Sequence, residues 1–199
     1  MDPYASLPGW HLIGQFPDHE PGDVGSWLLH HNGEAMLLEV PPGLTVDDVR
    51  KAMKAIGSPR LKFGFASHHH FDHLDPMAWS DLIYAFPSTV FICPGELSSG
   101  DHCLPIGGEP CWLIKAPKHS ISDTVTVFRG VGMTGDIELH QLKSINREVR
   151  KATRQASMDW LKGFQRRHGY HVHSVTNAHQ REHSIRRGVD WESLFSCRA

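Results

Sequence analysis

The stretch His68-His69-His70-Phe71-Asp72-His73 places four histidines and one aspartate within six residues. Their imidazole nitrogens and carboxylate oxygens are ligands that divalent transition metals prefer. Residues two apart in an extended segment point the same way, so His68 and His70 can face one ion together, whereas His69 points away and is the least expected ligand. Asp72 and His73 come next and can address a second ion. The alternative is a polar turn or an incidental histidine-rich tract.

The residues around this stretch predict a junction between a strand and a helix. Apolar residues alternate with polar or small ones over 61–66, which is the two-residue period of a strand. Asp75 and Pro76 suit the N-cap and the first position of a helix that we expect to end near Phe86. The potential ligands therefore follow a strand directly, at a position where loops commonly carry functional groups.

The rest of the chain alternates predicted strands and helices, without an internal repeat or a linker. Asn32-Gly33 predicts a tight hairpin, Thr45 is the expected N-cap of a helix, and the glycine- and proline-rich residues 94–110 are expected to form a long loop. The 3.6-residue period of apolar positions over 146–168 predicts a surface helix with a basic outer face. We expect one domain over residues 1–199. Its expected strands span 10–16, 24–31, 34–40, 61–65, 89–93, 111–115, 124–128, 131–134 and 171–175, and its expected helices span 45–56, 75–86 and 146–168.

Three further potential ligands follow other predicted strands. His119, Asp136 and His179 each come within a few residues of a strand's end. A single histidine is more often a surface or core residue than a ligand. Ligands at the ends of several strands, however, converge on one rim of a sheet. Their placement therefore predicts that all three join the 68–73 stretch in one site.

The order of these motifs resembles the metallo-β-lactamase superfamily, in its glyoxalase II-like branch. That branch's His-x-His-x-Asp-His motif is present in full at residues 68–73. Ala116-Pro117-Lys118-His119-Ser120 resembles its Pro-Gly-His-Thr/Ser turn, and Met133-Thr134-Gly135-Asp136 resembles its Thr-Gly-Asp motif. The resemblance covers nearly the whole chain. It implies an α+β fold, a four-layer αββα sandwich of mixed sheets flanked by helices, with the site at one sheet edge.

The resemblance also implies a site of two divalent metal ions. Carried over by position, its ligand set assigns the first metal to His68, His70 and His119, the second to Asp72, His73 and His179, and the bridge between them to Asp136. Zinc suits such a site, with iron or manganese as alternatives. Two metals lower the pKa of a shared water to about 7. Asp72 would then act catalytically, by orienting the resulting hydroxide and shuttling its proton.

The sequence departs from the family pattern in three places. The glycine that usually precedes the second-region histidine is Lys118, which is either neutral for function or a cation that binds an anionic substrate group. The segment Asn177-Ala178-His179-Gln180 lacks the common Gly-His pattern. The alternatives to His179 as the last ligand are His183, His173 and His140. Twenty residues follow His179, so we expect neither the C-terminal domain of true glyoxalase II nor the insertion of nuclease branches.

The resemblance implies a metal-dependent hydrolase that acts on a small ester, thioester, lactone or phosphoester. Hydrolysis of β-lactams is not expected, because the bridging aspartate is typical of the hydrolase branch and no periplasmic signal is seen. One alternative is an oxidoreductase similar to the persulfide dioxygenases of the superfamily, with one iron held by His68, His119 and Asp136. Another is a non-catalytic metal-binding or ligand-sensing module on the same fold.

Composition limits the partners and the compartment. The net charge is −2, but residues 1–140 carry 8 basic and 17 acidic side chains (−9), while residues 141–199 carry 12 and 5 (+7). We interpret the basic end as a solvated helix face, so RNA processing is a third and weaker alternative.

We expect a cytoplasmic protein without a membrane span. The reasons are four cysteines without a Cys-x-x-Cys spacing, no secretory signal and no long apolar run. We expect a small-molecule substrate, and Trp191, Leu194 and Phe195 allow a homodimer.

Overall fold

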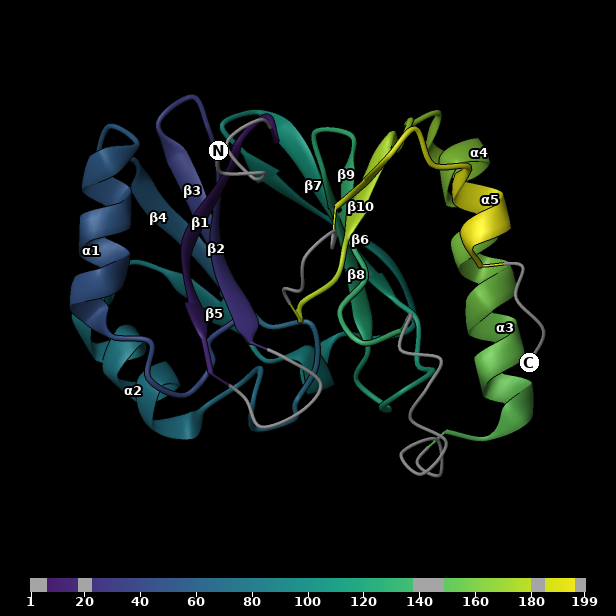
Figure 1. Ribbon diagram of the computed structural model, residues 1–199, viewed down its shortest axis with the longest axis horizontal. Coiled ribbons are helices and arrows are strands. Elements are labelled where there is room, and N and C mark those ends of the chain that lie inside the picture. Colours follow the sequence, from purple (N-terminus) through teal and green to yellow (C-terminus); the bar gives the residue numbers. More distant parts are fainter. Residues whose placement is uncertain (1–6, 18–22, 138–148, 180–184, 196–199) are drawn as a thin grey trace.

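The computed structural model describes residues 7–17, 23–137, 149–179 and 185–195. Two β-sheets lie face to face, and helices cover the outer face of each (Figure 1). The predicted α+β fold, a four-layer αββα sandwich, is confirmed. None of the described helices is long and apolar enough to cross a membrane.

The first sheet has the order β1-β2-β3-β4-β5 and is mixed, with β1, β2 and β3 antiparallel and β3, β4 and β5 parallel. Its strands are β1 (Trp10–Phe16), β2 (Val24–His31), β3 (Glu34–Leu38), β4 (Arg60–Phe65) and β5 (Val90–Ile92). Helices α1 (Val46–Ala55) and α2 (Pro76–Ala85) cover its outer face.

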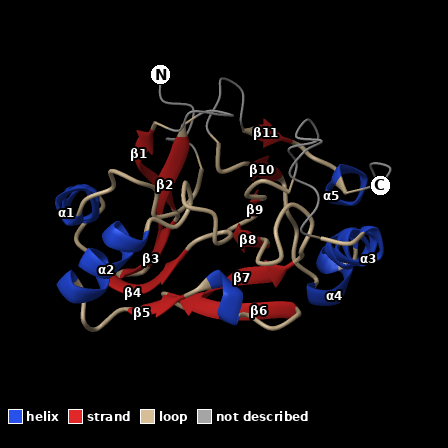
Figure 2. Cartoon of the chain, turned by 90° about the horizontal axis from the view of Figure 1, so that it is seen from below, coloured by secondary structure: helices blue, strands red, loops and turns tan. Residues whose placement is uncertain are grey.

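The second sheet has the order β11-β10-β9-β8-β7-β6 and is antiparallel except for the β9–β10 pair. Its strands are β6 (Gly100–Ile106), β7 (Glu109–Lys115), β8 (Thr124–Phe128), β9 (Val131–Met133), β10 (Ser174–Thr176) and β11 (Arg186–Arg187). Helices α3 (Lys151–Lys162), α4 (Phe164–His168) and α5 (Trp191–Leu194) lie against its outer face, as Figure 2 shows from below. A short 3₁₀ helix, η1, spans Pro94–Glu96.

Several local signals read from the sequence are confirmed. Thr45 caps α1 in a reciprocal capping box with Asp48, and the Asp75 carboxylate accepts the Ala78 backbone N–H at 2.7 Å at the start of α2. At the β2–β3 hairpin, Asn32 and Gly33 both have positive φ, 41° and 77°, as a type I′ turn requires.

Two predictions about secondary structure were wrong. Residues 94–110 are not a long loop, because β6 pairs with β7 through a turn at Gly107 and Gly108. β6 is an edge strand, where a proline such as Pro105 loses no ladder hydrogen bond, and this proline masked the strand signal. The helix expected over 146–168 begins at Lys151 and divides at Gly163 into α3 and α4; residues 146–148 lie outside the described ones.

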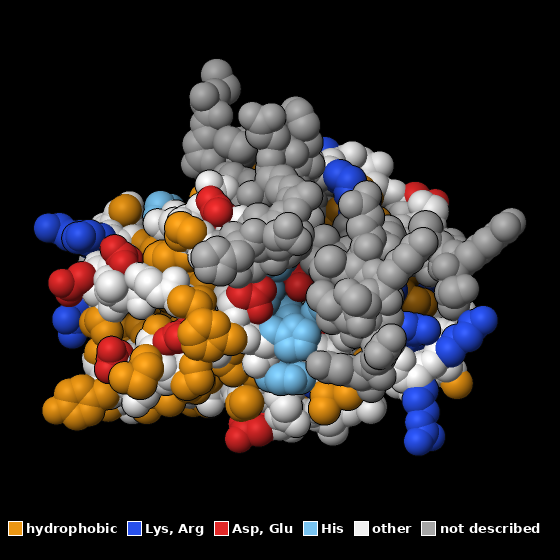
Figure 3. All heavy atoms as spheres, turned by 60° about the horizontal axis from the view of Figure 1, so that its bottom comes forward, with side chains coloured by type: hydrophobic (Ala, Val, Ile, Leu, Met, Phe, Trp, Pro, Cys, Tyr) orange, Lys and Arg blue, Asp and Glu red, His pale blue; other side chains and the backbone are white. Residues whose placement is uncertain are grey.

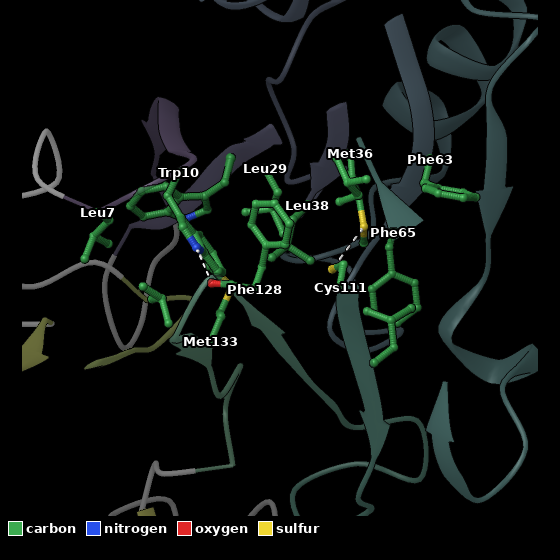
Figure 4. Close-up of a cluster of buried hydrophobic side chains, with 14 residues drawn as sticks. Leu7, Trp10, Leu29, Met36, Leu38, Phe63, Phe65, Cys111, Phe128 and Met133 are labelled. Carbon is green, nitrogen blue, oxygen red and sulfur yellow. Dashed lines mark hydrogen bonds between the residues drawn. The ribbon is translucent and has the colours of Figure 1, made fainter. Parts of the chain in front are cut away.

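The main core fills the space between the two sheets (Figure 4). It is built by alternate residues of β2, β3, β4, β7 and β8, whose other faces pack under the helices. Trp10 reaches across the core, where its indole N–H donates to the Phe128 carbonyl at 3.1 Å. Packing on both faces of both sheets holds the strand ends in fixed relative positions.

Leu113→Ala tests the core between the sheets. Leu113 is fully buried on β7, so its truncation is expected to lower the free energy of unfolding by about 2–5 kcal/mol. Tyr84→Ala on α2 is the control, because Tyr84 is 91% exposed and a surface substitution changes stability by less than about 0.5 kcal/mol. Urea unfolding measures both, and equal effects would contradict the assignment of the core.

Candidate metal centre

The seven sequence-predicted ligands lie on four loops, which follow β4, β7, β9 and β10. β9 and β10 are parallel neighbours with Met133 opposite Thr176, so the loops that carry Asp136 and His179 leave the second sheet at the same edge. Opposite them, the loop after β4 carries residues 68–73 from the first sheet. Figure 3 shows histidine and acidic side chains gathered near the middle of this face.

The first group of ligands consists of His68, His70 and His119, whose ligand atoms lie within 4.8 Å of one another. Nδ1 of His70 lies 3.1 Å from Nε2 of His68 and 3.1 Å from Nε2 of His119. A tetrahedral metal with metal–nitrogen distances of about 2.0–2.1 Å separates its ligand atoms by about 3.3 Å. Two of the three nitrogen–nitrogen distances therefore match a tetrahedral site, and the third, between His68 and His119, is within 4.8 Å.

The second group consists of Asp72, His73, Asp136 and His179, again within 4.8 Å. Nε2 of His73 lies 3.2 Å from Nε2 of His179. Oδ2 of Asp72 lies 3.2 Å from the former nitrogen and 3.4 Å from the latter. This group combines two imidazoles with two carboxylates, whereas the first consists of imidazoles alone.

Asp136 faces both groups, one carboxylate oxygen to each. Its Oδ2 lies 3.8 Å from Nε2 of His68 and 3.6 Å from Nε2 of His119. Its Oδ1 lies 3.4 Å from Nε2 of His73 and 3.3 Å from Nε2 of His179. This is the arrangement that a bridging carboxylate requires.

The residues present fit a pair of metal ions. Oδ1 of Asp136 is fully buried and, among the described residues, has no hydrogen-bond donor in good geometry, although two imidazole nitrogens lie close to it. A buried carboxylate oxygen without a donor is costly unless a cation satisfies it. Imidazole nitrogens within each group lie 3.1–3.2 Å from one another, and a metal ion bound by each group would replace these contacts with bonds to the metal.

Two imidazoles of the centre have opposite pKa shifts. Burial, together with the neighbouring His73, holds the pKa of His68 well below its usual value, so this ring is neutral and offers a lone pair. Burial would also lower the pKa of His179, but the carboxylates of Asp136 and Asp72 outweigh it and raise this pKa to about 9. In the metal-free protein at neutral pH, His179 therefore carries a proton that a metal must displace.

The proton on His179 predicts a pH-dependent affinity for the second metal. Because the pKa of His179 is about 9 and that of His73 is also raised, against its burial, by the carboxylates of Asp136 and Glu39, affinity should rise from pH 6 to pH 9, and binding at pH 7 should release protons. Calorimetric zinc titrations in buffers of different ionisation enthalpy measure the number released. His179→Ala is the control and should release fewer protons. An affinity that does not change between pH 6 and pH 9 would contradict this assignment.

Glu39 belongs to the centre and was missed by sequence reasoning. It is fully buried just after β3, and its carboxylate oxygen Oε2 lies 3.2 Å from Nδ1 of His73. The same carboxylate accepts the Ser67 backbone N–H at 3.2 Å, and Ser26 Oγ donates to the Glu39 carbonyl at 2.8 Å. A carboxylate on the second ring nitrogen orients a metal-bound histidine and raises its basicity. The sequence signal that could have identified Glu39 is its position as an acidic residue directly after the apolar run Met36-Leu37-Leu38.

Glu39→Gln tests this contact. The amide retains the size of the side chain but not its charge, so His73 is expected to bind metal more weakly. Loss of such an outer partner typically lowers metal affinity by about 10–100-fold. Zinc competition against a chelator measures the affinity, with Glu96→Gln, on the short helix η1, as the control. Unchanged zinc affinity in the Glu39 variant would mean that the contact has no role in binding.

The remaining candidates take other positions. His69 is exposed and its backbone N–H donates to Ser122 Oγ at 3.0 Å, so it belongs to neither group. The Lys118 ammonium donates to the Ile137 carbonyl; its expected role in substrate binding stays a prediction. His173 contacts Ser174 Oγ at 3.0 Å and is not part of either group. His140 and His183 lie outside the described residues.

His179 is attached to the first sheet as well as the second. It follows β10, yet it forms an isolated β-bridge with Val24 of β2, and the Gly25 N–H donates to the Ala178 carbonyl at 3.0 Å. The last ligand thus follows a strand of the second sheet and is joined to the first sheet by one isolated bridge.

Comparison with known proteins shows similarity in structure alone. No family model and no curated protein matches the sequence. Among solved structures, a metallo-β-lactamase family protein of Thermus thermophilus matches with a TM-score of 0.60 and 17% identity, over 96% of this chain and 78% of that one. A metallo-β-lactamase from Pontibacter korlensis matches with a TM-score of 0.65 and 14% identity, over 96% and 93%. ETHE1 from Myxococcus xanthus matches with a TM-score of 0.61 and 15% identity, over 89% and 79%.

Proposed function

We propose that this chain, which has the metallo-β-lactamase fold, is a metal-dependent hydrolase of a small ester, thioester, lactone or phosphoester. The observation that carries the proposal is the position of Asp136, whose two carboxylate oxygens face two separate groups of ligands. A site for a pair of ions is suited to hydrolysis.

Two divalent ions are the proposed cofactors, with zinc first and iron or manganese as alternatives. The ions would be held by His68, His70 and His119 in the first group, by Asp72, His73 and His179 in the second, and by Asp136 between them. When bound, such ions lower the pKa of a water molecule to about 7 and polarise a carbonyl or phosphoryl oxygen of the substrate.

Asp72 is the proposed catalytic carboxylate. Its side chain is 25% exposed, whereas those of His73 and His179 are buried, so it is the member of the second group that solvent reaches. Burial would raise its pKa, but contacts with His179 and His73 outweigh that effect and hold the pKa far below its usual value. Asp72 is therefore ionised at neutral pH and can orient the attacking water by accepting a hydrogen bond from it.

An iron-dependent oxidoreductase is the second candidate. His68 and His119 both lie within 4 Å of Oδ2 of Asp136, and two histidines with one carboxylate can hold a single iron. The second group counts against this reading, because a single-iron enzyme has no use for its three remaining ligands. A non-catalytic metal-binding module would likewise retain a complete ligand set without using it for catalysis.

Metal content and a reaction panel discriminate among these candidates. The hydrolase should hold two ions per chain and release product from at least one ester, thioester, lactone or phosphodiester without oxygen. One iron per chain with oxygen consumption would support the oxidoreductase. Bound metal without turnover under any loading would support the binding module.

Asp136→Ala is expected to lower bound metal below two ions per chain and to abolish turnover, because both groups lose a ligand oxygen. Elemental analysis and the same substrate panel measure the two effects. Asp159→Ala, on the exposed face of α3, is the control and should retain both properties. Full activity in the Asp136 variant would refute the bridging role.

A further inference from the structure

The turn that carries His119 is organised around one buried carboxylate. Oδ2 of Asp123 accepts three consecutive backbone N–H groups, those of Lys118 and Ser120 at 2.9 Å each and that of His119 between them. Its Oδ1 accepts the Ser120 hydroxyl at 2.7 Å. A charged acceptor with four donors is a strong arrangement, so residues 118–123 form a rigid unit.

This unit is attached to the loop that carries His68 and His70. The buried Ser122 hydroxyl accepts the His69 backbone N–H at 3.0 Å and also contacts Nδ1 of the His69 ring. Just beyond the turn, the Thr124 N–H donates to the Ser67 carbonyl at 2.9 Å. His69 thus serves as an attachment point between the two metal ligands that flank it.

The same unit is attached to the Asp136 turn. The Lys118 side chain donates from Nζ to the carbonyl of Ile137, the residue that follows Asp136. Ile137 is itself buried, so the bonded end of the lysine is held in place. Glycine, the usual residue at this position in the family that the sequence resembles, has no side chain to make this contact.

We propose that Ser122 and Lys118 are positioning residues that hold His119 against His70 and Asp136, and so determine the affinity of the first metal group. The inference rests on the metal centre of the proposed function, but not on its reaction. His119 is the only ligand of the first group that comes from outside the 68–73 loop. Metal sites tolerate errors of only about 0.2 Å in ligand distance, so a small displacement of this turn should weaken the first group.

The second group provides an internal comparison. None of its four members lies on the 118–123 turn. Ser122→Ala should therefore lower first-group affinity by about 10–100-fold, the usual effect of losing an outer partner, and leave second-group affinity unchanged. Lys118→Met removes a contact to the residue after Asp136, which belongs to the second group, so it should weaken the first group more than the second. Lys118→Arg, which retains a cationic donor, should weaken first-group affinity less than Lys118→Met does.

The experiment isolates each group by removing the other. A His73→Ala/His179→Ala background removes both histidines of the second group, so the first group binds zinc alone. A His68→Ala/His70→Ala background removes two of the three histidines of the first group, so the second group binds zinc alone. Zinc competition against a chelator is measured in both backgrounds with and without each substitution. The matched controls are Ser157→Ala, a buried serine of α3, and Lys62→Met, whose Nζ donates to the Pro105 carbonyl at 3.0 Å.

Every outcome decides the proposal. Selective weakening in the His73→Ala/His179→Ala background supports it, and retained binding in the His68→Ala/His70→Ala background shows that the variant has folded. Equal losses in both backgrounds, or no loss in either, overturn it. If Lys118→Met raises the KM of an anionic substrate without changing zinc affinity, Lys118 contacts substrate instead. The readout is zinc affinity, so selective weakening would support the positioning role even if the protein hydrolysed no substrate.

Discussion

The arrangement of this molecule depends on one buried carboxylate. Asp136 has oxygens directed at two groups of nitrogen and oxygen ligands, and one of these oxygens lacks a donor in good geometry among the described residues. Burial of such a group is unfavourable unless positive charge lies beside it. Metal ions bound by the two ligand groups would supply this positive charge. Ligand placement and core packing therefore constrain each other.

Packed strands and hydrogen-bonded loops hold the ligands around Asp136 in place. The loops after β9 and β10 emerge together because the two strands are parallel neighbours. The loop after β4 extends from the first sheet. The Thr124 N–H, at the start of β8, donates to the Ser67 carbonyl and so joins this loop to the second sheet. Behind the ligands, Glu39 fixes the ring of His73, and Asp123 fixes the backbone of the His119 turn. Sites supported in this way hold their ligands within small distance errors.

Much of the fold and of the candidate site could be predicted from the sequence, because the signals were local. Residues 68–73 have ligand spacing, Asn32-Gly33 has hairpin chemistry, and Asp75 has cap chemistry. The features that were missed depend on long-range contacts. Glu39 resembles an ordinary strand-end residue, and only the fold brings it to His73. The glycine and the proline of β6 hide its strand signal, and only its pairing with β7 identifies it as a strand. The anchoring of Lys118 to Ile137 likewise appears only when two distant turns meet.

The bridge that joins His179 to the first sheet has a consequence for the order in which the centre can assemble. The first group takes its three members from residues up to 119, and the contacts that hold His119 in place extend to Ile137, so all of these residues are synthesised before His179. The second group has to wait for Asp136 and for the bridge between His179 and Val24. On a chain that grows from its N-terminus, the imidazole-only half of the centre precedes the carboxylate-rich half.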